Sequence, residues 1–215
     1  MKYSEDISKL VIQNIEQHER AAMVIEEVDE SLLKAVEKES KSVIGDFKSA
    51  LDGNEELEFA DNNSLCFSFK DWLVSGLEGM LFGVSLNATD NEHHNDSASW
   101  VGHLCGIPYA SSGLILSFWV EHKSLNLKLP RLKSILVKQF ENSTELKAHG
   151  FKLSKKGDEL ELYLNFEQNK ILTHYPYELS EAMSPLVKAL EAVEKCKSEL
   201  DEIVKAVKTE SPKVD

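Results

Sequence analysis

Two residues in the middle of the chain have the types and the spacing that metal-dependent hydrolysis uses. Glu121 and Lys123 follow the apolar run 113–120 and are separated by one residue. Because side chains alternate along a strand, both would lie on the same face where that strand ends. A carboxylate in this position can bind Mg²⁺, while a lysine ammonium group steadies the attacking water or a phosphate. The pair is therefore a candidate catalytic site.

This spacing resembles the core of the PD-(D/E)xK nucleases, and it implies a Mg²⁺-dependent nuclease or phosphodiesterase. Asp90 or Asp96, which follow the apolar run 80–86, would supply the first acid. However, no Pro-Asp pair precedes the triplet, and the same acid-x-Lys spacing recurs at Glu39 and Glu145 in expected helices. The nuclease interpretation is therefore an alternative. The main prediction is a non-catalytic interaction protein without a cofactor.

A polar stretch at residues 90–96 holds further metal-ligand types. It contains His93 and His94, and His103 follows nine residues later. A divalent ion needs three or four ligands that converge on one point, whereas adjacent histidines on an extended strand point apart. We therefore interpret the stretch as a solvated loop and predict no metal site, with these histidines as the ligands of the alternative interpretation.

The cysteines favour a structural role. There are three of them, Cys66, Cys105 and Cys196, and none forms a CxxC pair. This pattern argues against a disulfide framework and a zinc site, and it is typical of the reducing cytoplasm. No apolar run reaches 18 residues and no signal peptide pattern is found, so we predict a cytoplasmic protein without a membrane span.

Charge makes nucleic acid an improbable partner. Asp and Glu total 37 against 24 Lys and Arg, which gives a formal net charge of −13. Only Arg20 and Arg131 are arginine, the residue that best contacts phosphate and guanine. The preference for lysine is also typical of an AT-rich genome, so we interpret the chain as a bacterial or phage accessory protein, with a defence-related role as one option.

The first 52 residues predict a long amphipathic helical arm. They contain no proline, apolar residues recur at steps of three, four or seven, and Asp52-Gly53 supplies a stop signal. An unbroken helix of this length would measure roughly 70 Å, which exceeds one compact domain. We therefore expect either a break near Glu37–Ser42 or an arm that projects.

The C-terminal segment 177–215 predicts a second long helix. Ser184 and Pro185 are a cap and a first helical residue, and apolar residues then follow at near-heptad spacing. We expect this helix to pack antiparallel on the N-terminal arm, with a frayed tail from about residue 209.

The segment between them, residues 53–176, predicts a core of strands. Short alternating or apolar runs at 57–61, 65–69, 80–86, 113–120, 160–166 and 171–175 are separated by turn residues, and a helix is expected over 130–149. A shorter helix is possible at 97–105. The sequence therefore predicts an α+β fold with a mainly antiparallel sheet of five to six strands and helices packed on it.

Together these features favour a non-catalytic interaction protein, such as an accessory or inhibitory subunit. The partner would be another protein, or a second copy bound through the terminal helices. An acidic DNA-mimicking inhibitor is a further alternative, although lysines are interspersed among the acids of residues 26–39. The predicted interface consists of Ile15, Ala22, Ile25, Leu32, Val36, Leu190, Val193, Leu200 and Val204.

Overall fold

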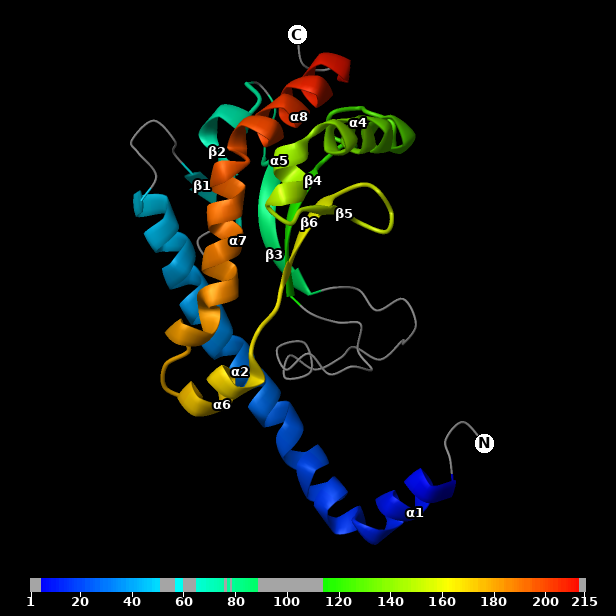
Figure 1. Cartoon of the computed structure of the whole chain (residues 1–215), viewed down its shortest axis with the longest axis vertical. Coiled ribbons are helices and arrows are strands. Elements are labelled where there is room, and N and C mark those ends of the chain that lie inside the picture. The colour runs from blue at the N-terminus through cyan, green and yellow to red at the C-terminus, as the bar shows by residue number, and fades with distance from the viewer. Residues whose placement is uncertain are drawn as a thin grey trace.

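The computed structural model describes residues 5–50, 57–59, 65–75, 77, 79–88 and 114–212. They form an antiparallel sheet with helices packed against it (Figure 1), so the α+β class is confirmed. In chain order the elements are α1 (Glu5–Gln13), α2 (Ile15–Ala50), β1 (Leu57–Phe59), β2 (Cys66–Phe69), η1 (Lys70–Trp72), β3 (Phe82–Ala88), β4 (Leu114–Val120), α4 (Leu129–Asn142), α5 (Thr144–Ala148), β5 (Lys152–Leu153), β6 (Leu160–Leu164), α6 (Gln168–His174), η2 (Ser180–Met183), α7 (Ser184–Lys195) and α8 (Lys197–Glu210).

The described sheet has the strand order β1-β2-β3-β4-β6-β5, and every neighbouring pair is antiparallel. Strand β4 lies inside the sheet and pairs along its full length with β3, from Val120 opposite Phe82 to Leu114 opposite Ala88. All of β4 except Trp119 is buried. A strand covered on both faces is expected to be a continuous apolar run, which explains its sequence.

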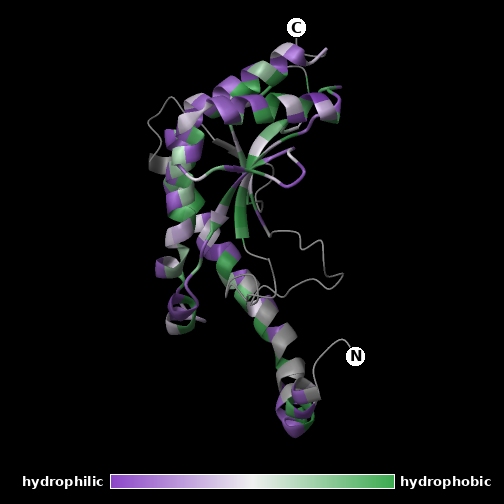
Figure 2. Ribbon diagram, turned by 45° about the vertical axis from the view of Figure 1, so that its right-hand side comes forward, coloured by the Kyte–Doolittle hydropathy of each residue, from purple (hydrophilic) through white to green (hydrophobic). Residues whose placement is uncertain are grey.

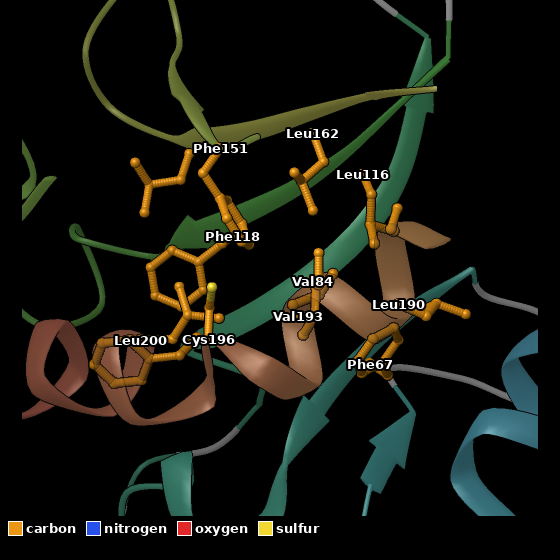
Figure 3. Close-up of a cluster of buried hydrophobic side chains, with 14 of the residues drawn as sticks. Phe67, Val84, Leu116, Phe118, Phe151, Leu162, Leu190, Val193, Cys196 and Leu200 are labelled. Carbon is orange, nitrogen blue, oxygen red and sulfur yellow. The ribbon is translucent and has the colours of Figure 1, made fainter. Parts of the chain in front are cut away.

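One face of the sheet is apolar and carries the core. The pairing register places Val84, Phe118 and Leu160 in one row and Leu116 beside Leu162. Figure 3 shows Val84, Leu116, Phe118 and Leu162 directed toward residues of α7, α8 and the turn between them, namely Leu190, Val193, Cys196 and Leu200. Burial of such side chains is the main stabilising contribution to a fold.

The opposite face carries small and polar residues. Ser85 lies beside Ser117, and Gly83 lies beside Trp119. A Cβ atom on Gly83 would stand 2.8 Å from Cζ2 of Trp119 and 2.9 Å from the sulfur of Met80. Glycine is therefore required here so that the Trp119 ring can lie across β3.

The N-terminal helix breaks at Asn14, and the expected break near Glu37–Ser42 is wrong. The side-chain amide of Asn14 donates to the Leu10 carbonyl at 2.8 Å and competes with the helical backbone for that acceptor. Around Ser40 the helix continues because Val36, Ser40 and Ile44 are all buried against the body. Packing on one face keeps this part of α2 helical.

The expected antiparallel packing of the terminal helices is also wrong. Tyr175 donates to Ser31 at 2.9 Å, and Ser40 contacts Met183 at 3.9 Å, so later residues of α2 meet later residues of the C-terminal segment. Helices α2 and α7 therefore run in the same direction (Figure 1). In the chain, the strands of the sheet lie between these two helices, so the helices do not form a helical hairpin.

The C-terminal helix consists of two pieces. Its start at Ser184 with Pro185 in the first turn agrees with the sequence, although Met183 occupies the cap position. At Cys196 the chain turns, and α8 packs on α4 instead of continuing along α2 (Figure 1). The turn allows the two halves of one amphipathic helix to cover different parts of the sheet.

The expected strand at Ile171–Tyr175 is helix α6. Ile171 is buried and Tyr175 half-buried, whereas Leu172 and Thr173 between them are exposed. In a strand Thr173 would face inward with Ile171 and Tyr175, so its exposure fits a helical turn and not a strand. The strand that pairs with the outer edge of β6 is instead β5, joined to it by the turn at residues 154–157.

The helix expected over residues 130–149 divides at Ser143. The Ser143 hydroxyl accepts a hydrogen bond from the Leu146 backbone N–H at 3.1 Å and begins α5 as its cap. Pro130 lies in the first turn of α4, and Gly150 ends α5 with a positive φ of 87°, as the sequence predicts. The end of α5 determines where the following strand begins.

Truncation of Phe118 is expected to destabilise the fold strongly. Its ring is 1% exposed and packs edge-on against Trp72 at a centroid distance of 5.3 Å. Phe118→Ala should lower the free energy of unfolding by about 3–5 kcal/mol through lost contacts and a cavity. Urea denaturation followed by circular dichroism measures this loss. Tyr177→Ala is the control, because Tyr177 is 90% exposed and its truncation should change stability little.

Candidate functional site

Five of the nine exposed large hydrophobic side chains among the described residues lie on the first two helices. Residues 5–30, here called the projecting segment, extend away from the sheet and its covering helices (Figure 1). Leu10, Ile12 and Ile15 are 58%, 71% and 50% exposed. Along the same helix, exposure falls from 50% at Val24 to 3% at Leu32, where α2 reaches the body. Figure 2 shows both hydrophobic and hydrophilic residues on the coloured part of the segment.

The projecting segment is also acidic. Asp6, Glu16, Glu19, Glu27 and Glu30 are exposed on it. Two of these acids form ion pairs one helical turn apart: Glu16 with Arg20 at 2.8 Å, and Glu30 with Lys34 at 2.6 Å. Exposed pairs of this kind contribute little to stability because water and salt screen the two charges. The segment therefore combines exposed apolar side chains with an excess of negative charge.

The structure separates the nine predicted interface residues into two groups. Ile15 is exposed, and the side chains of Ala22 and Ile25 lie outside the described set. The other six have at most 3% of their surface exposed and pack within this chain, so they cannot contact a partner in this fold. They are Leu32, Val36, Leu190, Val193, Leu200 and Val204.

The acid-x-Lys pair lies where the sequence places it, directly after β4. The Glu121 carboxylate accepts a hydrogen bond from the Lys123 backbone N–H at 3.2 Å, which forms a local turn. Between them, Nδ1 of His122 lies 2.9 Å from the Leu127 carbonyl and helps to close the same loop. These contacts are those of a structural loop that leads into α4.

The remaining predicted site residues lie outside the described residues. They are Asp90, Asp96, His93, His94 and His103, with the Cys105 thiol and the possible helix at 97–105. The first acid of the nuclease interpretation and the alternative metal ligands therefore stay predictions.

A cluster of charged and aromatic residues that the sequence did not reveal joins α8 to η1. Nε1 of Trp72 donates to Asp201 at 2.6 Å, and the ring is 1% exposed. Lys197 forms ion pairs with Asp71 at 2.7 Å and Asp201 at 2.9 Å, and its ammonium lies 5.0 Å from the Phe69 ring centroid. Because the residues at 69–72 are 126 or more positions away in the chain from Lys197 and Asp201, only the fold brings the two groups together.

The cations in this cluster respond differently to their surroundings. Partial burial opposes the charged form of Lys197, but hydrogen bonds to Asp71 and Asp201 outweigh it and raise its pKa. Lys208, which donates to the Asp71 and Leu73 carbonyls at 3.2 Å, has its pKa lowered by burial despite the same two carboxylates. The two cations and two carboxylates neutralise one another. We call the contacts of Asp71 and Trp72 with Lys197 and Asp201 the clamp, because they hold α8 against η1.

A second polar group lies on the face of the sheet opposite the core. Nδ2 of Asn87 donates to the hydroxyls of Ser85 at 2.7 Å and Ser117 at 2.9 Å. Burial, together with the charges of Asp158 and Glu161, raises the pKa of Glu159 despite its hydrogen bond to Ser117. Ser117 is fully buried, so its hydroxyl is a partner in this network and not an accessible nucleophile.

Two kinds of chemistry, metal binding and thiol reactivity, depend on the His, Cys, Asp and Glu side chains of the described residues. No group of three or more His, Cys, Asp or Glu among them could hold a metal ion. Burial raises the pKa of Cys196 to about 11, which keeps this thiol protonated and unreactive.

No helix among the described residues is both long enough and apolar enough to span a bilayer. No protein-family model, curated protein or solved structure matches the chain.

Loss of Asp201 is expected to open the clamp. Asp201→Ala leaves Nε1 of Trp72 without its acceptor and removes one of the two acids beside Lys197. The free energy of unfolding should fall by about 1–3 kcal/mol, which chemical denaturation measures. The neighbouring Glu202→Ala should change stability by less than about 0.5 kcal/mol, because its contact with Lys205 at 3.5 Å is exposed. Equal effects of the two variants would contradict the clamp.

Glu159→Gln is expected to stabilise the fold at pH 7 and to change it little at pH 4. An acid whose pKa rises on folding above the reference value of 4.5 destabilises the fold only where it ionises. This penalty is absent below pH 4.5 and complete above the raised pKa. Urea denaturation at both pH values should show a gain at pH 7 of up to about 1 kcal/mol, discounted for partial exposure. The exposed Glu141→Gln is the control; a pH-independent gain would argue against this explanation.

Proposed function

We propose that this chain is a non-catalytic interaction protein, an accessory or inhibitory subunit that binds another protein through its projecting segment. The observation that carries the proposal is the exposure of Leu10 and Ile12 on α1 and of Ile15 and Val24 on the first part of α2. Burying a Leu, Ile or Val side chain completely contributes about 1.5–3 kcal/mol relative to leaving it exposed. A partner that covers these half-exposed side chains would gain roughly half of that from each.

The geometry of the segment suggests how a partner would bind. Ile15 stands three heptads before Val36, so it lies close to the helical seam that packs against the body further along α2. Val11 is also exposed, but it lies on α1, on the other side of the break at Asn14. A second helix could therefore pack in the manner of a coiled coil along the first part of α2, beyond the point where the body ends, with α1 beside its end.

The charge of the segment indicates the chemistry of the partner. Its exposed acids include Glu19, which lies one helical turn after Ile15. A helix with an apolar seam and basic flanking residues would complement them, whereas a second acidic copy of this chain would be repelled. We therefore expect a basic amphipathic helix as the partner and a monomer when the protein is alone.

The two alternative functions have less support from the described geometry. A DNA mimic needs unpaired acids on one face, but Glu16 and Glu30 are paired with neighbouring bases. The nuclease interpretation has only Glu121 and Lys123 among the described residues, and the Glu121 carboxylate bonds to a backbone N–H of its own loop.

The proposal is tested with a synthetic helix of about four heptads that has Ile at a, Leu at d and Lys at e and g. Light scattering should show that the protein alone is monomeric, and titration calorimetry should show 1:1 binding that weakens as salt is added. The Val11→Glu, Ile15→Glu double variant should lose binding at least tenfold. An affinity that falls as salt is added would indicate that the lysines of the peptide contact the acids of the segment, which supports a partner with basic flanking residues.

The matched control is Leu172→Glu, because Leu172 is 66% exposed but lies on α6. It should bind the peptide like the unmodified protein. Two results would contradict the proposal. One is dimerisation of the protein through the segment, and the other is a double variant that binds the peptide as tightly as the unmodified protein does.

A further inference from the structure

The outer edge of β6 is only partly covered. Strand β5 pairs with Leu160 and Glu161 and no further, through Leu153 and Lys152. The reason lies just before β5: Gly150 has a φ of 87°, and its N–H caps α5 by donating to the Lys147 carbonyl at 3.1 Å. Within the described part of the chain, the second half of β6 therefore has a strand on one side only.

The backbone groups at this edge can be assigned from the pairing. Ser154 donates its N–H to the Glu159 carbonyl at 3.0 Å, so the Glu159 backbone faces β5. In a strand, N–H and C=O groups point to alternate sides from one residue to the next. Glu161 and Tyr163 consequently face the same way as Glu159, and at Tyr163 no described strand is present to receive them.

A groove of about 420 Å³ runs beside this edge, between β6 and α7. Leu162, Ala189 and Ala192 are buried apolar residues along it. Its polar lining is mainly basic: His149, Lys152 and Lys188 outnumber the single acid Glu167. The ammonium of Lys152 lies 5.1 Å from the Tyr163 ring centroid, which holds a positive charge next to the open backbone.

We propose that this edge binds an extended acidic peptide segment of a partner as an additional strand. Open N–H and C=O groups in strand geometry are complementary to an extended backbone, which is the basis of β-strand addition. The apolar residues of the groove accept small apolar side chains of the peptide. Lys152 and Lys188 then select acidic neighbours by charge.

A second copy of the chain is a poorer occupant of the same edge. Pairing β6 with β6 of another molecule would bring Lys152 and Lys188 close to their own counterparts, and like charges across an interface are unfavourable. The site is also separate from the projecting segment, so the test of strand binding does not depend on whether the segment binds a helix.

The probe is a fluorescein-labelled peptide, acetyl-Val-Glu-Val-Glu-Val-Glu-amide, added to the full-length protein. Fluorescence anisotropy should give a dissociation constant on the order of 10–100 μM. Hydrogen exchange followed by NMR should show that saturating peptide slows exchange of the Tyr163 amide at least tenfold. The Leu162 amide, which faces β4, should be unchanged.

Two further peptides test the strand geometry directly. One carries N-methyl groups on every valine and the other on every glutamate. An added strand pairs with β6 through only one of these two sets, so one peptide should lose binding and the other should retain it.

Charge variants test the groove. Lys188→Glu should weaken binding roughly fivefold. Lys155→Glu, an equal change at an exposed turn residue that does not line the groove, should have no effect.

Three results would overturn the proposal: no binding at 1 mM peptide, equal binding of both methylated peptides, or protection that appears away from Tyr163. Self-association that protects Tyr163 without any peptide would assign the edge to a second copy and would likewise overturn it.

Discussion

The apolar face formed by β3, β4 and β6 is the constraint on which the other elements depend. Val84, Leu116, Phe118 and Leu162 project from this face in register, and they would be costly to leave in water. Helices α7 and α8 cover it (Figure 3), and the break at Cys196 lets a single amphipathic stretch bend over the twisted surface. The need to bury this apolar face thus determines where the helices pack.

The polar contacts reinforce the same arrangement. Trp72 fills the end of the apolar face, and its indole N–H would be unsatisfied without Asp201. Lys197 satisfies that carboxylate and Asp71 together, which ties α8 to the end of β2. A buried polar group is tolerated only when its partners are present, so this clamp restricts α8 to one position.

Two surfaces remain after the core is covered, and they differ in kind. The body reaches α2 only from about Leu32 onward, which leaves an acidic helix with exposed apolar side chains. The turn at Gly150 delays the start of β5, which leaves the Tyr163 backbone at a basic edge. We propose a basic helix as the partner of the first surface and an acidic strand as the partner of the second. Opposite charges on the two surfaces allow two partners, or two parts of one partner, to be distinguished.

The sequence alone determined the elements whose patterns are unambiguous. The alternation at residues 160–164, the apolar run of β4, Pro130, Pro185 and Gly150 predicted strands and helix ends correctly, because local sterics and hydrogen bonding control them. The short run at 171–175 fits either period, so packing decided it. The same-direction packing of α2 and α7, the clamp around Trp72 and the open edge at Tyr163 depend on residues far apart in the chain. Only the tertiary structure decided them, because each is a contact between elements and not a property of any one segment.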